Sequence, residues 1–299
     1  MTTARLLDLV CFSYLADAQV LCVDQYPPAN SGAVVHQTSA SMAGDGPLAA
    51  VLASTRGLRV GLITNPIGED PAGHRLLAWL ERAQVSHTIR QIRTIGTPQL
   101  TVIADGSDTR TWFASTQHVS QHLLTVDLAL ITRARLLYVD CYRVLDKAAA
   151  RVIDAAIDTP LLLNLGGDPL DPHLVELAHG RQIRAVQTSL DETRATEAES
   201  YAENLFRQLH PDAAIVTVGR LGAVAHTALG TCRVAAPEAP SITHTHGAGA
   251  AFSAGYAHAL LSGADITTAL HAGCAAGTEH CSGQSATVPR QLPAATFAA

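Results

Sequence analysis

Apolar and polar positions in the second half of the chain repeat in a regular order of short strands and amphipathic helices. Apolar strands that alternate with helices form parallel βαβ units, whose strands are buried on both faces. Two longer helices complete the pattern near the C-terminus. The sequence therefore predicts an α/β fold with a central, mostly parallel sheet. The predicted strands lie at 136–140, 160–165, 185–187 and 214–218, and the predicted helices at 147–156, 171–178, 197–209, 250–262 and 265–281.

The first half of the chain departs from this regular order. A buried strand at 6–15 and a strand at 59–64 fit the sheet, with helices at 47–53 and 72–83. Several further β-prone pieces, some of them flanking turn-forming segments, do not fit a doubly wound sheet. We expect them to form a small β lid, from segments of about 17–40 and 86–114, on a single domain spanning 1–299. These pieces lie at 20–23, 34–37, 88–92, 99–104 and 109–113.

Composition narrows the classes of function. The 299 residues are 47% apolar, which is enough for a large core. The net charge is -6 without a run of lysines or arginines, so we expect neither a nucleic-acid nor a membrane partner. Six scattered cysteines without a CxxC pair indicate reduced thiols. With no leader pattern and no apolar stretch of about 18 residues, the expected location is cytoplasmic.

The sequence 247–250 is the most informative polar feature of the chain. A Gly-Ala-Gly turn lets main-chain amides converge, and the helix that follows adds unpaired donors and the positive end of its dipole. This arrangement predicts a phosphate cradle. Ala250 supplies no acid or base to it. His244 and His246 precede the turn and are either replacement bases or polar loop residues, since imidazole titrates near neutral pH.

Four segments resemble motifs of the ribokinase-like (PfkB-type) carbohydrate and nucleoside kinases, in the same order and over most of the chain. The segment 67–73 is similar to that family's GxDxxG, and 43–50 to its Gly-Gly followed by Asn. The segment 217–223 resembles the strand and glycine turn that flank the nucleotide. The cradle at 247–250 is similar to the GAGD anion hole, with Ala250 at the position of the catalytic Asp.

The resemblance implies a three-layer α/β/α domain with a β lid. It also implies that a hydroxyl of a small sugar- or nucleoside-like substrate attacks the γ-phosphate of ATP, with Mg²⁺ between the phosphates. Such an enzyme acts mainly by positioning and charge stabilisation. The family's lids often pair between subunits, so the resemblance also implies a homodimer through the lid.

Candidate site residues follow from these matches and from the ends of the predicted strands. Leu48 stands where the family has a substrate-binding Asn, and the sugar-binding Asp falls on Ala18, one residue from Asp17. Asn164 and Asp168 follow the end of a strand, where ligands gather in α/β sheets. The full sets are His246, Gly247, Ala248, Gly249 and Ala250 for catalysis; Thr217, Gly219, Gly222, Ser189 and Glu192 for the nucleotide, with Glu192 also organising water around Mg²⁺; and Asp17, Gly44, Asp45, Leu48, Arg110 and Asn164 for the substrate.

Several polar residues of these motifs and sets also have a purely structural interpretation. Asp70 suits the N-cap of the helix that starts at 72, and Glu192 suits a first helical turn. Arg110 suits an edge strand as a solvated charge. Asp17 and Asp45 suit turns.

Ala250 leaves several functions open. The chain is a kinase impaired by the missing Asp, a catalytically inactive pseudokinase that binds a nucleotide or sugar-like ligand, an engineered Asp-to-Ala variant of an active kinase, or a protein that runs a different reaction in the same pocket.

Overall fold

A nine-stranded sheet forms the centre of the molecule. The computed structural model describes residues 7–105, 110–239, 242 and 245–283. The strand order is β15-β14-β13-β12-β11-β10-β1-β4-β6. Strands from β13 to β6 pair in parallel, and β14 and β15 add an antiparallel edge. The bounds are β1 (Leu7–Phe12), β4 (Val60–Ile63), β6 (Ser86–His87), β10 (Ala134–Asp140), β11 (Leu161–Asn164), β12 (Ile183–Ser189), β13 (Ala213–Thr217), β14 (Ala223–Thr227) and β15 (Gly230–Val234).

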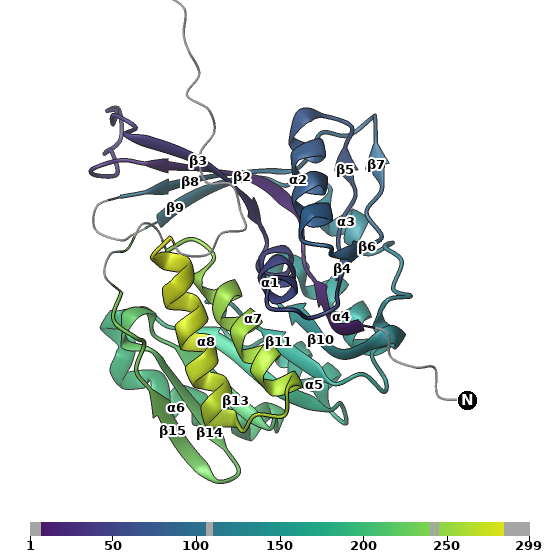
Figure 1. Cartoon of the computed structure of the whole chain (residues 1–299), viewed down its shortest axis with the longest axis vertical. Coiled ribbons are helices and arrows are strands. Elements are labelled where there is room, and N and C mark those ends of the chain that lie inside the picture. The colour runs from purple at the N-terminus through teal and green to yellow at the C-terminus, as the bar shows by residue number, and fades with distance from the viewer. Residues whose placement is uncertain (1–6, 106–109, 240–241, 243–244, 284–299) are drawn as a thin grey trace, which may run out of the picture.

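Helices cover both faces of this sheet (Figure 1). Because side chains alternate along a strand, Leu136 and Tyr138 join the core under α1, α2, α7 and α8, whereas Leu137 and Val139 join the core under α3 to α6. The predicted three-layer α/β/α fold is confirmed. None of the described helices is long and apolar enough to cross a membrane. The helices are α1 (Asp45–Ser54), α2 (Pro71–Arg82), α3 (Val119–Leu123), α4 (Asp146–Ala155), α5 (Pro172–Ala178), α6 (Ala198–Leu209), α7 (Ala248–Leu261) and α8 (Ile266–Cys281).

A second, four-stranded sheet stands above the helices α7 and α8 at the upper left of Figure 1. We call it the lid sheet; its order is β3-β2-β8-β9. Part of the segment 86–114 does not belong to it, because β6 extends the central sheet and β7 (Gln91–Ile92) pairs with β5 (Ile67–Gly68). The lid strands are β2 (Ala16–Cys22), β3 (Gln37–Ala43), β8 (Gln99–Ala104) and β9 (Arg110–Ser115).

Two predicted strands have other bounds in the structure, and one strand pair was not predicted. The strand expected at 6–15 ends at Phe12, where the chain turns toward the lid and the Leu15 amide donates to Asn65 Oδ1 at 2.8 Å. The strand expected at 34–37 lies in an exposed connection, with Val34 at 73% exposure, and β3 begins only at Gln37. The antiparallel pair β14–β15 was not predicted, because its short strands follow a glycine turn and lack a helix between them.

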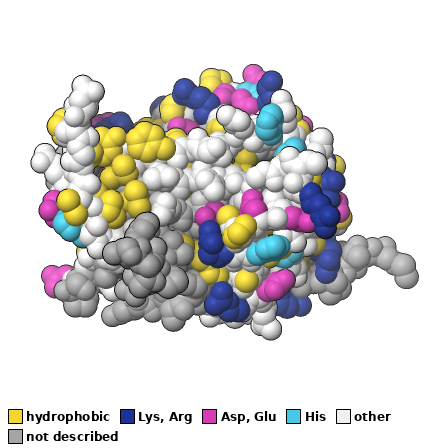
Figure 2. Space-filling model, turned by 90° about the horizontal axis from the view of Figure 1, so that it is seen from above, with side chains coloured by type: hydrophobic (Ala, Val, Ile, Leu, Met, Phe, Trp, Pro, Cys, Tyr) yellow, Lys and Arg dark blue, Asp and Glu magenta, His cyan; other side chains and the backbone are white. Residues whose placement is uncertain are grey.

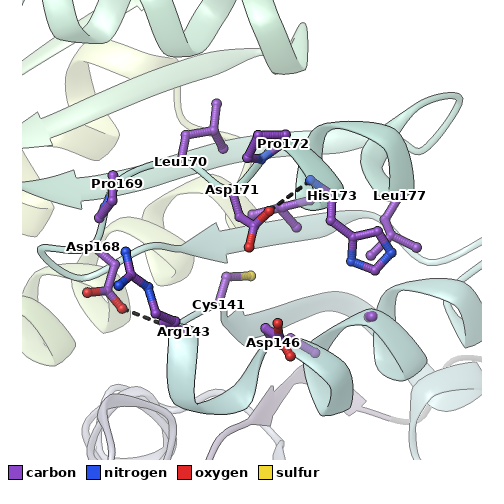
Figure 3. Close-up of a pocket in the computed structure, with 13 residues that line it drawn as sticks. Cys141, Arg143, Asp146, Asp168, Pro169, Leu170, Asp171, Pro172, His173 and Leu177 are labelled. Atoms are coloured by element: carbon purple, nitrogen blue, oxygen red, sulfur yellow. Dashed lines mark hydrogen bonds between the residues drawn. The ribbon is translucent and has the colours of Figure 1, made fainter.

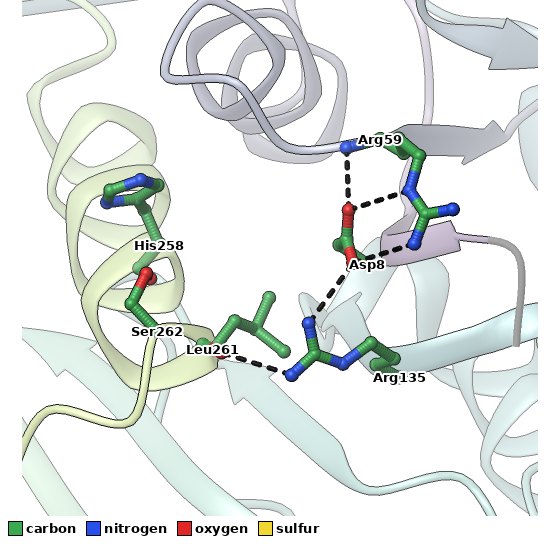
Figure 4. Close-up of polar contacts among 6 residues, drawn as sticks. All are labelled: Asp8, Arg59, Arg135, His258, Leu261 and Ser262. Carbon is green, nitrogen blue, oxygen red and sulfur yellow. Dashed lines mark hydrogen bonds and ion pairs between the residues drawn. The ribbon is translucent and has the colours of Figure 1, made fainter.

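Asp8 ties several elements together at the amino end of the sheet (Figure 4). Its carboxylate accepts hydrogen bonds from the Arg59 main chain and side chain, and from Arg135 at 3.2 Å. Arg135 also donates to the carbonyl of Leu261 at the end of α7. One carboxylate therefore joins β1 to the start of β4, to β10 and, through Arg135, to α7.

Candidate functional site

The helix α7 begins with two main-chain donors that have no partner among the described residues. Gly247, at φ 82°, ends the approach to the helix in the left-handed conformation. The amide of Ala248 donates to the carbonyl of Thr245, and that of Ala251 to the carbonyl of Gly247. Gly249 and Ala250 lie between them, and nothing in the described part of the chain accepts from their amides. We call these two amides, which are open only in the sense that no described residue accepts from them, the cradle; they lie at the positive end of the α7 dipole.

Two carbonyl oxygens of the same turn are in hydrogen-bond contact with side chains. The hydroxyl of Ser253 lies 2.9 Å from the carbonyl oxygen of Gly249 and 2.7 Å from Oε1 of Gln187. His280 Nε2, on α8, lies 2.8 Å from the carbonyl oxygen of His246. These contacts fix the orientation of the turn, so the open amides are preorganised.

A buried polar row crosses the carboxyl ends of three neighbouring strands. The register places Asp140 opposite Asn164 and Asn164 opposite Gln187. The Asp140 carboxylate is completely buried and accepts from Tyr138 Oη at 2.8 Å, Asn164 Nδ2 at 2.8 Å and the amide of Gly46 at 2.9 Å. Burial raises its pKa to about 7, and the neighbouring Asp45 adds to this shift.

Asp45 connects this row to the cradle. It is the first residue of α1, and its Oδ2 accepts from Tyr142 Oη at 2.5 Å and from Asn164 Nδ2 at 3.2 Å. A Cβ atom placed on Gly249 would lie 3.9 Å from the same oxygen. The structure therefore brings together Asp45, Asn164 and the cradle. The sequence had indicated the first two as substrate residues and the cradle as a separate phosphate site.

Four members of this cluster were not predicted from the sequence: Tyr138, Asp140, Tyr142 and Gln187. A signal for Asp140 and Gln187 was present, because each lies at or near the end of an apolar strand, as Asn164 does. Tyr138 carried no such signal, since an apolar strand often contains an aromatic residue. Tyr142 follows the end of β10, but a tyrosine in a connection does not by itself mark a site.

Two predicted substrate residues are engaged elsewhere. Asp17 forms a two-point ion pair with Arg75 of α2, with distances of 3.1 and 2.7 Å. Leu48 is 1% exposed and belongs to the core, and its Cδ1 would lie 3.1 Å from a Cβ atom on Gly247. Leu48 therefore supports the turn from behind and presents no polar group to a ligand.

The other predicted residues around the cradle lie close to it. Gly44 is the N-cap residue of α1, and Arg110 of the lid sheet donates to the carbonyl of Thr245 at 3.0 Å. His246 is partly buried, and its Nε2 lies 3.4 Å from the carbonyl oxygen of Met42. Burial lowers the pKa of His246, and the Arg110 charge lowers it further. His244 lies outside the described residues.

The predicted nucleotide residues form a tightly bonded turn. Glu192 accepts from the amide of Arg220 at 2.9 Å and pairs with its guanidinium at 2.8 Å. A Cβ atom on Gly222 would lie 2.0 Å from the carbonyl oxygen of Val234, so only glycine fits there. Gly219 starts η4 (Gly219–Leu221) beside Glu192. Two hydroxyls bond to main-chain carbonyls nearby: Thr217 to Thr188 at 3.3 Å and Ser189 to Gly166 at 3.1 Å.

Asp70 is the N-cap of α2, as its structural interpretation proposed. Its carboxylate accepts from the amide of Gly73 at 2.8 Å and from the hydroxyl of Thr97 at 2.7 Å.

A pocket of 270 Å³ opens on the opposite face of the sheet, between α4 and α5 (Figure 3). Two of its carboxylates are already bonded: Asp168 accepts from the amide of Arg143 at 2.9 Å, and Asp171 from that of His173 at 2.8 Å. Since Cys141 lines it and the neighbouring Asp140 faces α1, the sheet separates this pocket from the cradle.

Comparison with known proteins settles the family. A family model described as pfkB family carbohydrate kinase matches residues 7–292. The chain belongs to this family. The expected membership in the PfkB-type kinases is thus confirmed. No curated protein matches the chain.

Solved structures show the same fold at low sequence identity. The microbiome-derived acarbose kinase Mak1 has a TM-score of 0.73 at 18% identity, covering 92% of this chain and 93% of that chain. The Arabidopsis thaliana ribokinase complexed with ribose and ATP has a TM-score of 0.71 at 16% identity, covering 92% of each. The nucleoside kinase of Methanocaldococcus jannaschii has a TM-score of 0.70 at 16% identity, covering 96% of each.

Proposed function

We propose that this PfkB protein transfers the γ-phosphoryl group of ATP to a hydroxyl of a small sugar- or nucleoside-like substrate. The open amides of Gly249 and Ala250 carry this proposal, because two unpaired donors at a helix N-terminus bind phosphate oxygens. Arg110 reaches from the lid sheet to the same turn and adds a positive charge. The solved relatives support the acceptor class, since one is a ribokinase complexed with ribose and ATP and another a nucleoside kinase.

The two amides of the cradle suit the phosphates of a nucleotide. The described residues offer Mg²⁺ few direct ligands. Both carboxylate oxygens of Glu192 contact Arg220. The described residues contain no group of three His, Cys, Asp or Glu side chains that could hold a metal ion. We therefore propose that Mg²⁺ enters with the phosphates of ATP and neutralises their charge.

The test is incubation with ATP, Mg²⁺ and a panel of sugars and nucleosides, followed by detection of phosphorylated product. Gly247→Ala is the cradle variant, since a Cβ atom there would lie 2.9 Å from His280 Nε2 and strain the turn. We expect it to weaken ATP binding about tenfold or more. Gly263→Ala is the matched control, because Gly263 also has a positive φ (88°) but nothing within 4 Å of the added atom.

A binding-only function is the second candidate, and Ala250 favours it because its methyl group cannot accept a proton. In that case ATP or a sugar raises the unfolding temperature without any product. Product formation by the wild-type chain would eliminate the pseudokinase.

We also propose that two copies pair through the lid sheet. Its edge strand β9 exposes Trp112 at 65% and Phe113 at 54%, which is unusual for large apolar side chains. Figure 2 shows hydrophobic side chains gathered over the lid sheet. Pairing of the two lids would remove this apolar surface from water.

A further inference from the structure

The proposed reaction needs a group that accepts the proton of the attacking hydroxyl. Ala250 stands where the family has its catalytic Asp, and it is completely buried among apolar side chains. We propose that Asp45, the first residue of α1, is the general base of this chain, delivered to the cradle from a different helix. This inference rests on the phosphotransfer function proposed above.

The position of Asp45 fits this role. Its Oδ2 lies 3.9 Å from the site of a Cβ atom on Gly249, the residue directly before Ala250. The same oxygen is held by Tyr142 and Asn164, at 2.5 and 3.2 Å. The other oxygen, Oδ1, has no hydrogen-bond partner in the described part of the chain. One oxygen thus fixes the carboxylate, and the other is available to a substrate hydroxyl.

The surroundings of Asp45 also suit this role. Asp140 is the more deeply buried member of the carboxylate pair, and burial raises its pKa to about 7, which lessens the negative charge beside Asp45. The N-terminal end of α1 further favours a negative charge on its first residue. The titratable groups that face Asp45 are Tyr14, Tyr138, Asp140, Tyr142 and His246.

His246 is the competing base and is less suited. Both burial and the charge of Arg110 lower its pKa. Its Nε2 faces the carbonyl oxygen of Met42 at 3.4 Å, so when Nε2 donates to this carbonyl only Nδ1 remains to accept a proton.

In the proposed step one bond forms and one bond breaks at the γ-phosphorus of ATP. The substrate hydroxyl gives its proton to Oδ1 of Asp45, and its oxygen forms a bond to the γ-phosphorus. The bond from that phosphorus to the oxygen that bridges to the β-phosphate breaks, and the electron pair leaves on ADP. The amides of Gly249 and Ala250 stabilise the charge on the transferred phosphoryl group.

The experiment compares steady-state kinetics of Asp45→Asn and the wild-type chain, with ATP, Mg²⁺ and the best acceptor from the panel. We expect kcat to fall about 10²–10⁴-fold with the KM for ATP nearly unchanged, since the general base contributes that factor. Adding Ala250→Asp to Asp45→Asn returns a carboxylate to the family's position and should restore much of kcat. Asp146→Asn is the matched control, because Asp146 is the first residue of α4 and is exposed on the other face of the sheet.

Other outcomes overturn the proposal. Unchanged kcat in Asp45→Asn, a raised KM with unchanged kcat, or loss of turnover in His246→Ala instead would each remove Asp45 as the base and leave the phosphotransfer function intact. Absence of product from the wild-type chain would remove both. If Asp45→Asn does not fold, Tyr142→Phe deletes only the hydroxyl that orients Asp45; we expect it to lower kcat about tenfold, and wild-type kcat in this variant would refute the proposal.

Discussion

At the scale of residues, the site is distinguished by a carboxylate buried inside the molecule rather than at its surface. Asp140 accepts hydrogen bonds from Tyr138, Asn164 and the amide of Gly46, and no Lys or Arg of the described residues pairs with it, so its charge is only partly compensated. The raised pKa follows from this burial and from Asp45, and it couples the stability of the fold to pH.

The pKa of Asp140 makes the folded state less stable as pH rises. Because the folded pKa of Asp140 is about 7 and an unfolded Asp titrates near 4, the folded state binds more protons between these values. The contribution of this group to stability therefore decreases as pH rises from about 4 to 7. We expect Asp140→Asn to reduce this loss, measured as the difference between urea midpoints at pH 5 and pH 7.5. An identical difference in wild type and variant would show that Asp140 is ionised throughout.

At the scale of elements, two contacts hold the helices of the site in place. Ser253 and Gln187 fix the start of α7 against the sheet, and Asp8 with its two arginines fixes the other end of the same helix through Leu261. The distance between the cradle and Asp45 depends on this fixation, because α1 and α7 carry its two sides.

The ion pairs of Asp8 with its arginines contribute to the stability of the fold. The hydrogen bonds from Arg59 hold the pKa of Asp8 at about 2, below its unfolded value, so its contribution is present above about pH 4 and is lost as pH falls toward 2. We expect Asp8→Asn to reduce the free energy of unfolding by about 1–3 kcal/mol at pH 7, from urea titration. Asp154→Asn removes a more exposed pair with Arg181 at 3.5 Å and should cost about 1 kcal/mol or less. Equal losses in the two variants would contradict this argument.

At the scale of the whole molecule, the lid sheet has an apolar edge that the described residues leave exposed. Pairing with a second copy would bury Trp112 and Phe113 and would place two sites next to one shared lid.

The double variant Trp112→Lys, Phe113→Lys tests this pairing. We expect the wild-type chain to sediment as a dimer and the variant as a monomer, because two charges in each copy oppose burial of the edge. Leu229→Lys is the control, since Leu229 is fully exposed at the tip of the β14–β15 hairpin, away from the lid. A wild-type monomer at the same concentration would refute lid pairing.

The sequence by itself determined the layers of the fold and the place of the cradle. Apolar strands such as β10 and β11 are buried on both faces, and the Gly-Ala-Gly turn needs no distant partner to be recognised, because both signals are local. The N-cap at Asp70 was equally local.

Only the tertiary structure decided which side chains face the cradle. Asp45 and Asp140 are far apart in the chain and meet because α1 packs over the end of β10, and Asp17 is drawn to Arg75 by the packing of α2 on β2. Ion pairs and buried carboxylate clusters depend on distances set by packing, so periodicity and motif spacing cannot predict them. For the same reason, a carboxylate missing at Ala250 could be sought only in the folded molecule.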